Sequence, residues 1–270
     1  MPWWDGAMVV APGTGWPGDL ADAATPVATT SDEVVALAAS AEQLGDLDAR
    51  VSVCRACPRL VEWRETVATT KRASFATEAY WGRPVTGWGP ADARIAVVGL
   101  APAAHGGNRT GRVFTGDRSG DWLFASLHRN GLARLATSVT AGDGQALIDV
   151  RMLAAVRCAP PQNLPTPAER LTCRPWLVRE LSLLRPTLRV VVALGNFAWT
   201  ASWPVLRELG YDLPRARARF GHGVEVSTPD GLLLVACYHP SQQNTFTGKL
   251  TEPMLDAVFA RARGQIGKSN

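Results

Sequence analysis

Four cysteines of this 270-residue chain are spaced as one pair and two single residues: Cys54, Cys57, Cys158 and Cys173. Their neighbours are polar residues, proline and arginine, which is typical of loops rather than of a buried apolar run. A zinc finger keeps its ligand pairs close in sequence, whereas four unevenly spread thiolates commonly hold an iron–sulfur cluster. The spacing therefore favours one metal centre. Two disulfides, or four unrelated thiols, are the alternative.

A second group of residues with reactive or aromatic side chains follows runs that are expected to be buried strands. They are Phe114 and Asp117 in a glycine-rich segment after residues 94–100, Asn163 after residues 149–156, and His239 after residues 232–238. A carboxylate, an amide and an imidazole on neighbouring strand ends can bind and activate a small substrate. The alternatives are structural: Asp117 as a helix cap, Phe114 as a core plug and His239 as a satisfied histidine.

The elements that position these residues alternate along the chain. Strands are expected at residues 94–100, 149–156, 188–194 and 232–238, and helices at residues 31–44, 60–70, 119–131, 167–184, 196–209 and 252–264. This alternation predicts an α/β fold with three layers, α/β/α, around a mostly parallel central sheet. Ligands of such sheets bind beyond the carboxyl ends of the strands, which is where the residues above are placed.

Composition and charge limit the classes to which the chain can belong. Five cysteines are too few for a disulfide scaffold, and the net charge of +4 is compatible with a polyanionic partner. No leader and no apolar stretch of transmembrane length is recognisable, so we expect a cytoplasmic protein without membrane association. Residues 1–45 are rich in Ala, Thr, Gly and Pro, and are expected to form a flexible extension of a single domain at residues 46–265.

Four motifs, together with the cysteines, resemble the uracil-DNA glycosylase superfamily and specifically its family 5 (type b), whose members carry an iron–sulfur cluster. The motifs are Gly99-Leu-Ala-Pro-Ala, Gly111-Arg-Val-Phe-Thr-Gly-Asp, Val156-Arg-Cys-Ala-Pro-Pro-Gln-Asn and Tyr238-His-Pro-Ser-Gln-Gln-Asn-Thr. The resemblance runs from about Cys54 to Ala262 and leaves residues 1–45 outside. Leu100 and Ala154 stand where the similar family 4 has an acid and an asparagine, which favours family 5.

The resemblance implies an enzyme that hydrolyses the N-glycosidic bond of uracil, hypoxanthine or ethenocytosine in DNA, within base excision repair. It also implies a 4Fe–4S cluster on Cys54, Cys57, Cys158 and Cys173. Cys237 matches no ligand position, and its place in an apolar strand predicts a small buried side chain. A monomer that works in the cytoplasm at the nucleoid is the default expectation for such a protein.

The expected roles divide the site residues into three sets. Asp117 orients or deprotonates a water, His239 stabilises the departing base, and Asn163 positions water or base. The flipped base stacks on Phe114, beside the backbone of Gly99, Leu100, Ala101 and Pro102. Contacts to the DNA backbone and duplex are expected from Arg109, Arg112, Gln242, Gln243, Asn244 and Lys249.

Two other classes of protein share some of these features. A non-catalytic protein that binds damaged or single-stranded DNA would keep Phe114, the arginines and the cluster, but would not need both Asp117 and His239. An electron carrier built on the cluster gives no reason for His239-Pro-Ser directly after a strand. The sequence therefore favours the glycosylase.

Overall fold

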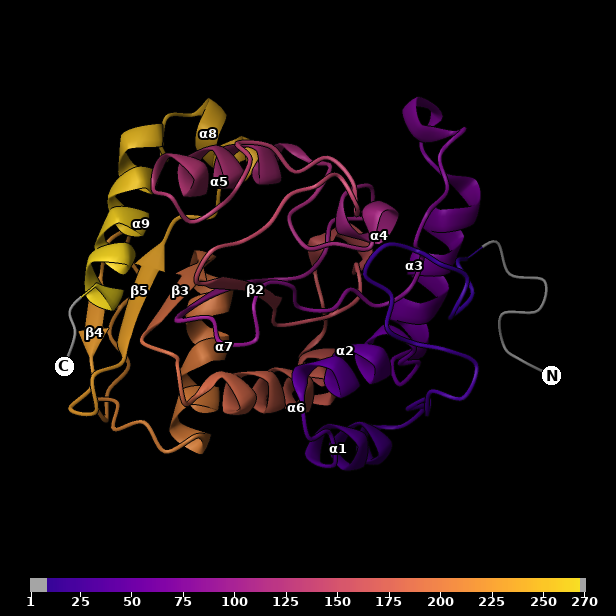
Figure 1. Ribbon diagram of the computed structural model, residues 1–270, viewed down its shortest axis with the longest axis horizontal. Coiled ribbons are helices and arrows are strands. Elements are labelled where there is room, and N and C mark those ends of the chain that lie inside the picture. Colours follow the sequence, from indigo (N-terminus) through magenta and orange to yellow (C-terminus); the bar gives the residue numbers. More distant parts are fainter. Residues whose placement is uncertain (1–8, 268–270) are drawn as a thin grey trace.

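Residues 9–267 are described by the computed structural model, in which helices cover both faces of a five-stranded sheet (Figure 1). The strands are β1 (Ile95–Gly99), β2 (Val150–Ala154), β3 (Val190–Leu194), β4 (Glu225–Ser227) and β5 (Leu233–Cys237). Their order is β2-β1-β3-β5-β4, and every pairing is parallel except that of β4 with β5. The predicted fold class is confirmed. The short edge strand β4 was not expected, because its three residues carry no buried apolar run.

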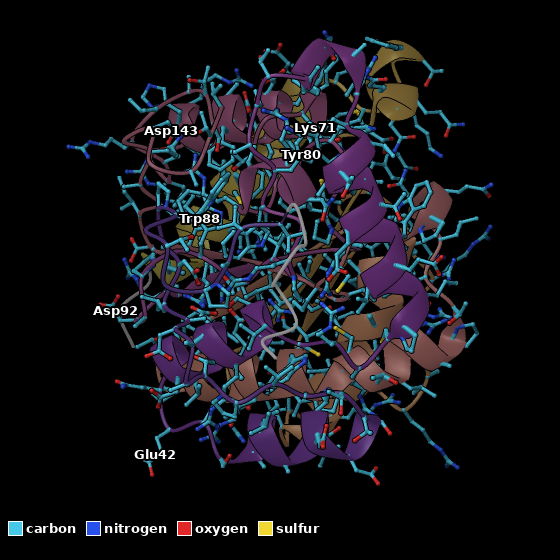
Figure 2. All side chains as sticks on the ribbon, turned by 90° about the vertical axis from the view of Figure 1, so that its right-hand side faces the viewer. Glu42, Lys71, Tyr80, Trp88, Asp92 and Asp143 are labelled. Carbon is cyan, nitrogen blue, oxygen red and sulfur yellow. The ribbon has the colours of Figure 1, made fainter. Side chains whose placement is uncertain are left out.

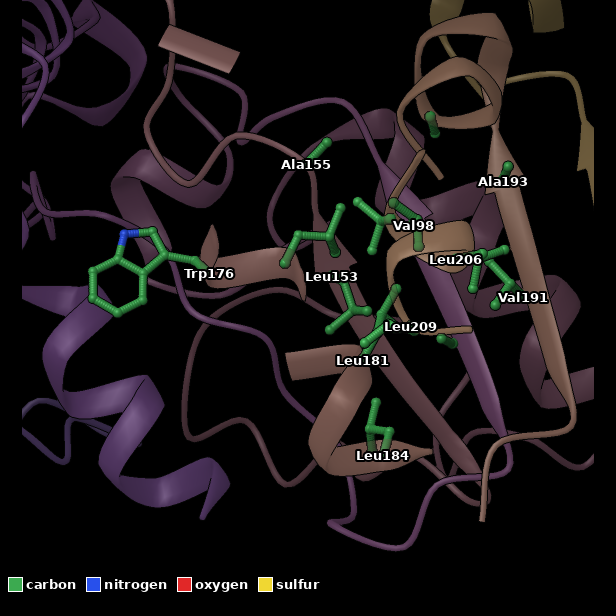
Figure 3. Packing of buried hydrophobic residues seen from close by; sticks show 14 of the residues in the cluster. Val98, Leu153, Ala155, Trp176, Leu181, Leu184, Val191, Ala193, Leu206 and Leu209 are labelled. Carbon is green, nitrogen blue, oxygen red and sulfur yellow. The ribbon is translucent and has the colours of Figure 1, made fainter. Parts of the chain in front are cut away.

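Side chains of the parallel strands alternate between two cores, because successive residues of a strand point to opposite faces. Ile95 and Val97 of β1 pack on the side of helices α5 (Arg118–Arg129) and α9 (Glu252–Ile266). Ala96 and Val98 pack on the opposite side, against α6 (Pro167–Leu184) and α7 (Gly195–Glu208). Figure 3 shows this second core, where Val98 and Leu153 of the sheet lie near Leu181 and Leu206 of the helices. Burial on both faces explains the continuous apolar runs that predicted the strands.

The predicted helices agree with the structure where local signals mark their ends. Helix α6 begins and ends at the predicted residues. Its start is marked by Pro167 as the first helical residue and by the capping box that Thr166 forms with Glu169. Helices α3 (Pro58–Thr70), α5, α7 and α9 begin and end within two residues of the prediction. Two short helices, α4 (Gly107–Thr110) and α8 (Gln242–Phe246), were not predicted, because helices of this length are too short to show a hydrophobic periodicity. Single 3₁₀ turns lie at Ala73–Phe75 and Pro161–Asn163.

Residues 9–45 pack against the domain, in contrast to the flexible extension that was expected. Helix α1 (Ser31–Ala39) ends before the predicted residue 44, and α2 (Leu44–Ser52) follows it and was not predicted. Ala28, Val34 and Ala41 are fully buried in the core on the α6 side. In Figure 2 the label of Glu42 marks the loop between α1 and α2 at one end of the molecule, opposite Lys71 and Tyr80. Residues 1–8 of the expected extension lie outside the described range.

The small side chains of this segment explain why it was wrongly predicted to be flexible. Alanine, threonine and glycine were read as signs of disorder, yet alanines fit closely against the surface of α6, where larger residues would not. Asp19 of the same segment forms an ion pair of 2.7 Å with Arg83, whose side chain is completely buried. No helix between residues 9 and 267 has the length and apolar character needed to cross a membrane.

Candidate active site and cysteine cradle

A cavity of about 260 Å³ lies at the carboxyl ends of β1, β2 and β5. It brings together the residues that were predicted to bind and cleave the substrate, which are Gly99, Leu100, Ala101, Pro102, Phe114, Asp117, Asn163 and His239. Its wall also includes Ala103, Val113, Ser119, Ala154 and Ser241, which the sequence analysis did not place in a site. The parallel order of the strands explains the convergence, because their carboxyl ends meet at one edge of the sheet.

Phe114 forms one wall of this cavity and is at the same time part of the core beneath it. Its φ angle of 53° is left-handed, which is rare for an aromatic residue and stores on the order of 1–3 kcal/mol of strain. The ring lies directly on Gly99: a Cβ at that glycine would approach the Phe114 Cζ atom to 2.6 Å. Glycine at the end of β1 is therefore what admits the ring.

Asp117 is both the cap of helix α5 and a wall residue of the cavity. Its Oδ1 atom accepts a hydrogen bond of 2.9 Å from the Gly120 N–H. Its Oδ2 atom lies against Gly106, where a Cβ would be only 2.2 Å away. Burial raises the pKa of Asp117 above its usual 3.8, and the N–H groups of Gly120 and Ser119 oppose that rise. Asp117 therefore caps helix α5 and lines the cavity at the same time.

His239 is held in the neutral form by burial, which lowers its pKa from 6.5 to about 4. Its ring centroid lies 6.0 Å from that of Phe114, with the two planes tilted by 40°. The His239 carbonyl accepts a hydrogen bond of 2.9 Å from the Asn244 side-chain amide. His239 lines the cavity, and among the described residues no hydrogen bond is made by its ring nitrogens, so the imidazole is available to a ligand.

Asn163 stands at the rim of the cavity rather than inside it. Its side chain is exposed, and its φ angle of 58° follows a similar 54° at Gln162. Left-handed backbone is tolerated better by asparagine than by most residues. Two left-handed residues in succession turn the chain sharply after Pro161, and this turn carries Asn163 over the strand ends.

Two of the residues predicted to contact DNA are buried inside the protein, which corrects that prediction. Arg109 forms an ion pair with Glu78 and donates hydrogen bonds of 2.9 Å to the carbonyls of His105 and Gly116. Arg109 is only 6% exposed. Its guanidinium therefore braces the segment that carries Phe114 and Asp117.

Arg112, also predicted to contact a DNA phosphate, is 9% exposed and makes its contacts inside the protein. It pairs with Asp143 at 2.7 Å, donates to the Ser138 hydroxyl at 2.7 Å and lies over the Trp88 ring. The sequence showed two arginines in a polar, glycine-rich loop and gave no sign of their carboxylate partners, which are each 31 residues away.

The other residues that were predicted to contact DNA lie on or beside helix α8. Gln242 and Gln243 are exposed there, and so is Lys249, whose Nζ atom lies 5.0 Å from the centre of the Tyr238 ring. Asn244 is half-buried and, through its bond to the His239 carbonyl, acts inside the protein rather than on DNA. Phe246 is 69% exposed at the end of the same helix.

The four cysteines of the proposed metal centre line a single second cavity, which we call the cysteine cradle. Cys54 follows α2, Cys57 is the cap residue of α3, and Cys158 lies in the loop after β2. The polar neighbours of Cys173 are typical of a loop, but Cys173 lies inside helix α6, within the helix that was predicted at residues 167–184 and two residues before the in-helix Pro175. All five cysteines fall within the described residues and are free thiols, and Cys237 is fully buried in β5 as expected.

Burial dominates the electrostatics of the cysteine cradle. It raises the pKa of Cys57 to about 12 and also raises the pKa values of Cys54 and Cys173, and the neighbouring thiols add to each rise. Two N–H donors point at sulfur: the Arg64 Nη1 atom lies 2.9 Å from Cys158 Sγ, and the Arg157 backbone N lies 3.3 Å from Cys173 Sγ. Within residues 9–267 no three Cys, His, Asp or Glu side chains are grouped tightly enough for a single metal ion.

Comparisons with known proteins agree with this architecture. The model of the uracil DNA glycosylase superfamily matches residues 86–263, which include the sheet and the cavity at its edge. The type-5 uracil-DNA glycosylase of Mycobacterium bovis is 55% identical to this chain over 258 residues, which cover 96% of this chain and 95% of that protein. The type-5 enzyme of Thermus thermophilus is 49% identical over 217 residues, 80% of this chain and 95% of that protein. The chain therefore belongs to the type-5 uracil-DNA glycosylases.

Two details of these comparisons bear on the sequence analysis. A type-4 uracil-DNA glycosylase of Thermotoga maritima is 35% identical over 115 residues, or 42% of this chain, so the preference for the type-5 family is confirmed. A match that covers 96% of the chain extends well into residues 1–45. The resemblance thus begins earlier than Cys54, in agreement with the packing of residues 9–45.

Proposed function

We propose that this protein is a monofunctional DNA glycosylase, which hydrolyses the N-glycosidic bond of uracil in DNA and leaves an abasic site for base excision repair. The observation that carries this proposal is the convergence of an aromatic ring, a carboxylate and a neutral imidazole in one cavity at the strand ends. The printed names of the relatives support uracil as the base. We extend the substrates to hypoxanthine and ethenocytosine, because a stacking wall accepts any flat base.

The cavity takes a single nucleotide that has left the duplex. Extrusion of a nucleotide costs a few kcal/mol, and least at a mismatch such as uracil opposite guanine. Stacking on the Phe114 ring returns about 1–3 kcal/mol of that cost. Helix α8 supplies the exposed side chains beside the cavity: Gln242, Gln243 and Phe246 probe the duplex, and Lys249 pairs with a phosphate.

Bond cleavage places negative charge on the base and positive charge on the sugar. The electron pair of the C–N bond leaves with the base, and the neutral N–H of His239 donates to the base oxygen on which the charge develops. A preorganised donor of this kind lowers the activation barrier by about 3 kcal/mol. Asp117 accepts the proton of the attacking water, which forms the new bond to the sugar carbon, and its charge offsets the oxocarbenium character. Asn163 at the rim positions water or base.

The cysteine cradle holds a 4Fe–4S cluster in this proposal. The four thiols surround a cavity rather than a single point, which suits several irons, and two N–H groups directed at sulfur suit bound thiolates. The cluster ties α3 to α6 and to the loop that continues to Asn163, and it adds no group to the cavity at the strand ends. We further propose a monomer that acts in the cytoplasm at the nucleoid.

The test uses anaerobically purified protein and labelled duplexes that contain U·G, hypoxanthine·T or ethenocytosine·G. Alkali treatment converts an abasic site to a strand break. We expect cleavage at all three lesions, and a loss of about 100- to 1000-fold in His239→Ala and at least about 100-fold in Asp117→Asn. Asn keeps the side-chain oxygen that caps α5, so this variant removes the charge without removing the cap.

Asp121→Asn is the matched control, because Asp121 is an exposed carboxylate in the first turn of the same helix. Its rate should equal that of the wild type. Unchanged rates in Asp117→Asn would remove Asp117 from the mechanism. Tight, salt-sensitive binding without cleavage of any lesion would replace the glycosylase by a DNA-binding protein.

A further inference from the structure

Arg64 differs from the other buried arginines of the described chain. Six arginines are at least nine-tenths buried, and five of them have a carboxylate at hydrogen-bonding distance. The five pairs are Arg83 with Asp19, Arg109 with Glu78, Arg112 with Asp143, Arg151 with Asp48 and Glu180, and Arg157 with Glu180. Arg64, the sixth, has a cysteine sulfur instead.

The polypeptide compensates the charge of Arg64 only in part, through one carboxylate that it shares with Arg55. The side chain is completely buried on the apolar face of α3, between Leu60 and Val67. Its nearest carboxylate oxygen, on Glu65, lies 3.7 Å from Nη2 and is already hydrogen-bonded to Arg55. Neither Nε nor Nη2 of Arg64 has a hydrogen-bond partner among the described residues. A buried cation in this condition is strongly destabilising unless a negative group lies beside it.

The cradle itself offers such a negative group. Arg64 lines the same cavity as the four cysteines, and its Nη1 atom donates to Cys158 Sγ. We propose that Arg64 is the counter-charge of the iron–sulfur cluster: its guanidinium offsets the net negative charge of the cluster with its four thiolates, retains the cluster in the protein and raises its reduction potential. This inference rests on the cofactor proposed above. Net charge and hydrogen bonds to sulfur are the quantities by which a protein adjusts such a cluster.

Arg157 shows why burial and proximity are not sufficient for this role. It also lines the cysteine cradle, is 1% exposed and, like Arg64, has two nitrogens without a hydrogen-bond partner among the described residues. The difference is its carboxylate partner: Glu180 lies 2.5 Å from its Nη2 atom. Glu180 and Asp48 together match the charges of Arg157 and Arg151. The positive charge that remains for the cluster is therefore that of Arg64.

The experiment compares the wild type with Arg64→Gln, Arg64→Lys and the control Arg261→Gln. Arg261 pairs with Glu225 on the α9 side of the sheet, so its loss removes one positive charge away from the cradle. Each protein is purified without oxygen, its iron and acid-labile sulfide are measured, and the loss of visible absorbance is followed in air with an iron chelator. The reduction potential of the retained cluster is measured by voltammetry on an electrode.

We expect absorbance to be lost about tenfold faster in Arg64→Gln than in the wild type and Arg261→Gln, as for loss of one charge-assisted hydrogen bond. Its potential should shift to more negative values, because removal of a positive charge favours the oxidised cluster. A residue with only a packing role would leave the potential unchanged. Arg64→Lys keeps the charge but not the planar fork, so its potential should stay near that of the wild type while absorbance is lost several-fold faster.

The outcomes separate this inference from the proposed cofactor. Equal rates and equal potentials in the wild type and both Arg64 variants, all of them loaded with iron and sulfide, would overturn the role of Arg64 alone. A wild type without iron and sulfide after anaerobic purification would overturn the cofactor and the role together. If Arg64→Gln does not fold, Arg64→Met decides, because it also removes the charge: a potential and a rate equal to those of the wild type contradict the inference.

Discussion

The cavity at the strand ends and the cysteine cradle differ in how their polar groups are satisfied. In the cavity, Asp117 is held by the backbone of α5, and His239 is neutral and is fixed through its carbonyl by Asn244. In the cradle, the pKa values of three thiols are raised by burial, and two nitrogens of the Arg64 guanidinium have no hydrogen-bond partner within residues 9–267. The polypeptide alone fixes the positions of Asp117 and His239 in the first site, whereas it leaves a buried cation of the second with only part of its partners.

This difference indicates at which site the stability of the protein depends on a bound ligand. A cavity whose residues are held through hydrogen bonds of the backbone and of a helix cap keeps its geometry before DNA binds, which is the condition for stabilising a transition state efficiently. The proposed cluster would add negative charge beside the buried Arg64 cation and join the buried thiols, so in this proposal metal binding and folding are coupled at the cradle. Damage to the cradle should therefore appear first as lost stability, and damage to the cavity first as lost activity.

The largest expected effect is the loss of one cradle cysteine. Cys158→Ser should yield protein without the brown chromophore, with a free energy of unfolding lower by at least about 3 kcal/mol, because Arg64 is left as an unpaired buried charge. Denaturant unfolding and iron analysis measure this. Cys237→Ala, at a buried cysteine outside the cradle, should keep the chromophore and cost only about 1 kcal/mol. Full iron content in Cys158→Ser would contradict the comparison.

Gly99→Ala is the corresponding change in the cavity. The added methyl group meets the Phe114 ring at 2.6 Å, so the ring must move away from the strand end. We expect kcat/KM on U·G duplex to fall by about 10- to 100-fold with the iron content unchanged. The control is Gly264→Ala in α9, where nothing lies within 4 Å of the new Cβ; it should keep full activity and gain about 0.5 kcal/mol of stability. Equal activities would show that Phe114 does not depend on Gly99.

The pH dependence of stability tests whether His239 is neutral in the folded protein. Its pKa is about 4 when folded and 6.5 when exposed, so between these values the unfolded chain takes up a proton that the folded protein does not. Stability from this residue is present above pH 6.5 and is lost as the pH falls towards 4, by on the order of 2 kcal/mol. His239→Gln should lose less stability than the wild type over this interval, as measured by denaturant unfolding at several pH values. Parallel curves would mean that folding does not change the pKa of His239.

The smallest expected effect concerns the surface beside the cavity. Lys249→Ala should make the plot of log binding constant against log salt concentration less steep by about one unit of slope. It should weaken binding similarly for all lesions, because a phosphate contact carries no information about the base. Binding titrations at several salt concentrations measure the slope. Arg189→Ala removes an exposed charge next to the amino end of β3, opposite the cavity, and should leave the slope unchanged. The same change of slope in both variants would place the DNA elsewhere.

The sequence predicted the parallel strands, most helices and the membership of the cavity, because these depend on local patterns. Strands buried on both faces show as continuous apolar runs, and Thr166, Pro167 and Glu169 mark the start of α6 by themselves. Once the strands are parallel, residues that follow them must meet at one edge. The signal for Arg64 was also present and was missed: an arginine at helical spacing between Leu60 and Val67 lies on the buried face.

Only the tertiary structure decided which charged groups are free and which are paired. Arg109 and Arg112 appeared to be phosphate ligands, but Glu78 and Asp143, each 31 residues away, hold them inside the protein. Arg64 meets Cys158 across 94 residues, and residues 9–45 find their buried places on the surface of α6. Periodicity reports how one segment is buried, whereas the partner of a buried charge comes from another segment. The amino-acid sequence alone therefore determined where the chemistry lies, and the packing of distant segments determined which residues are available to perform it.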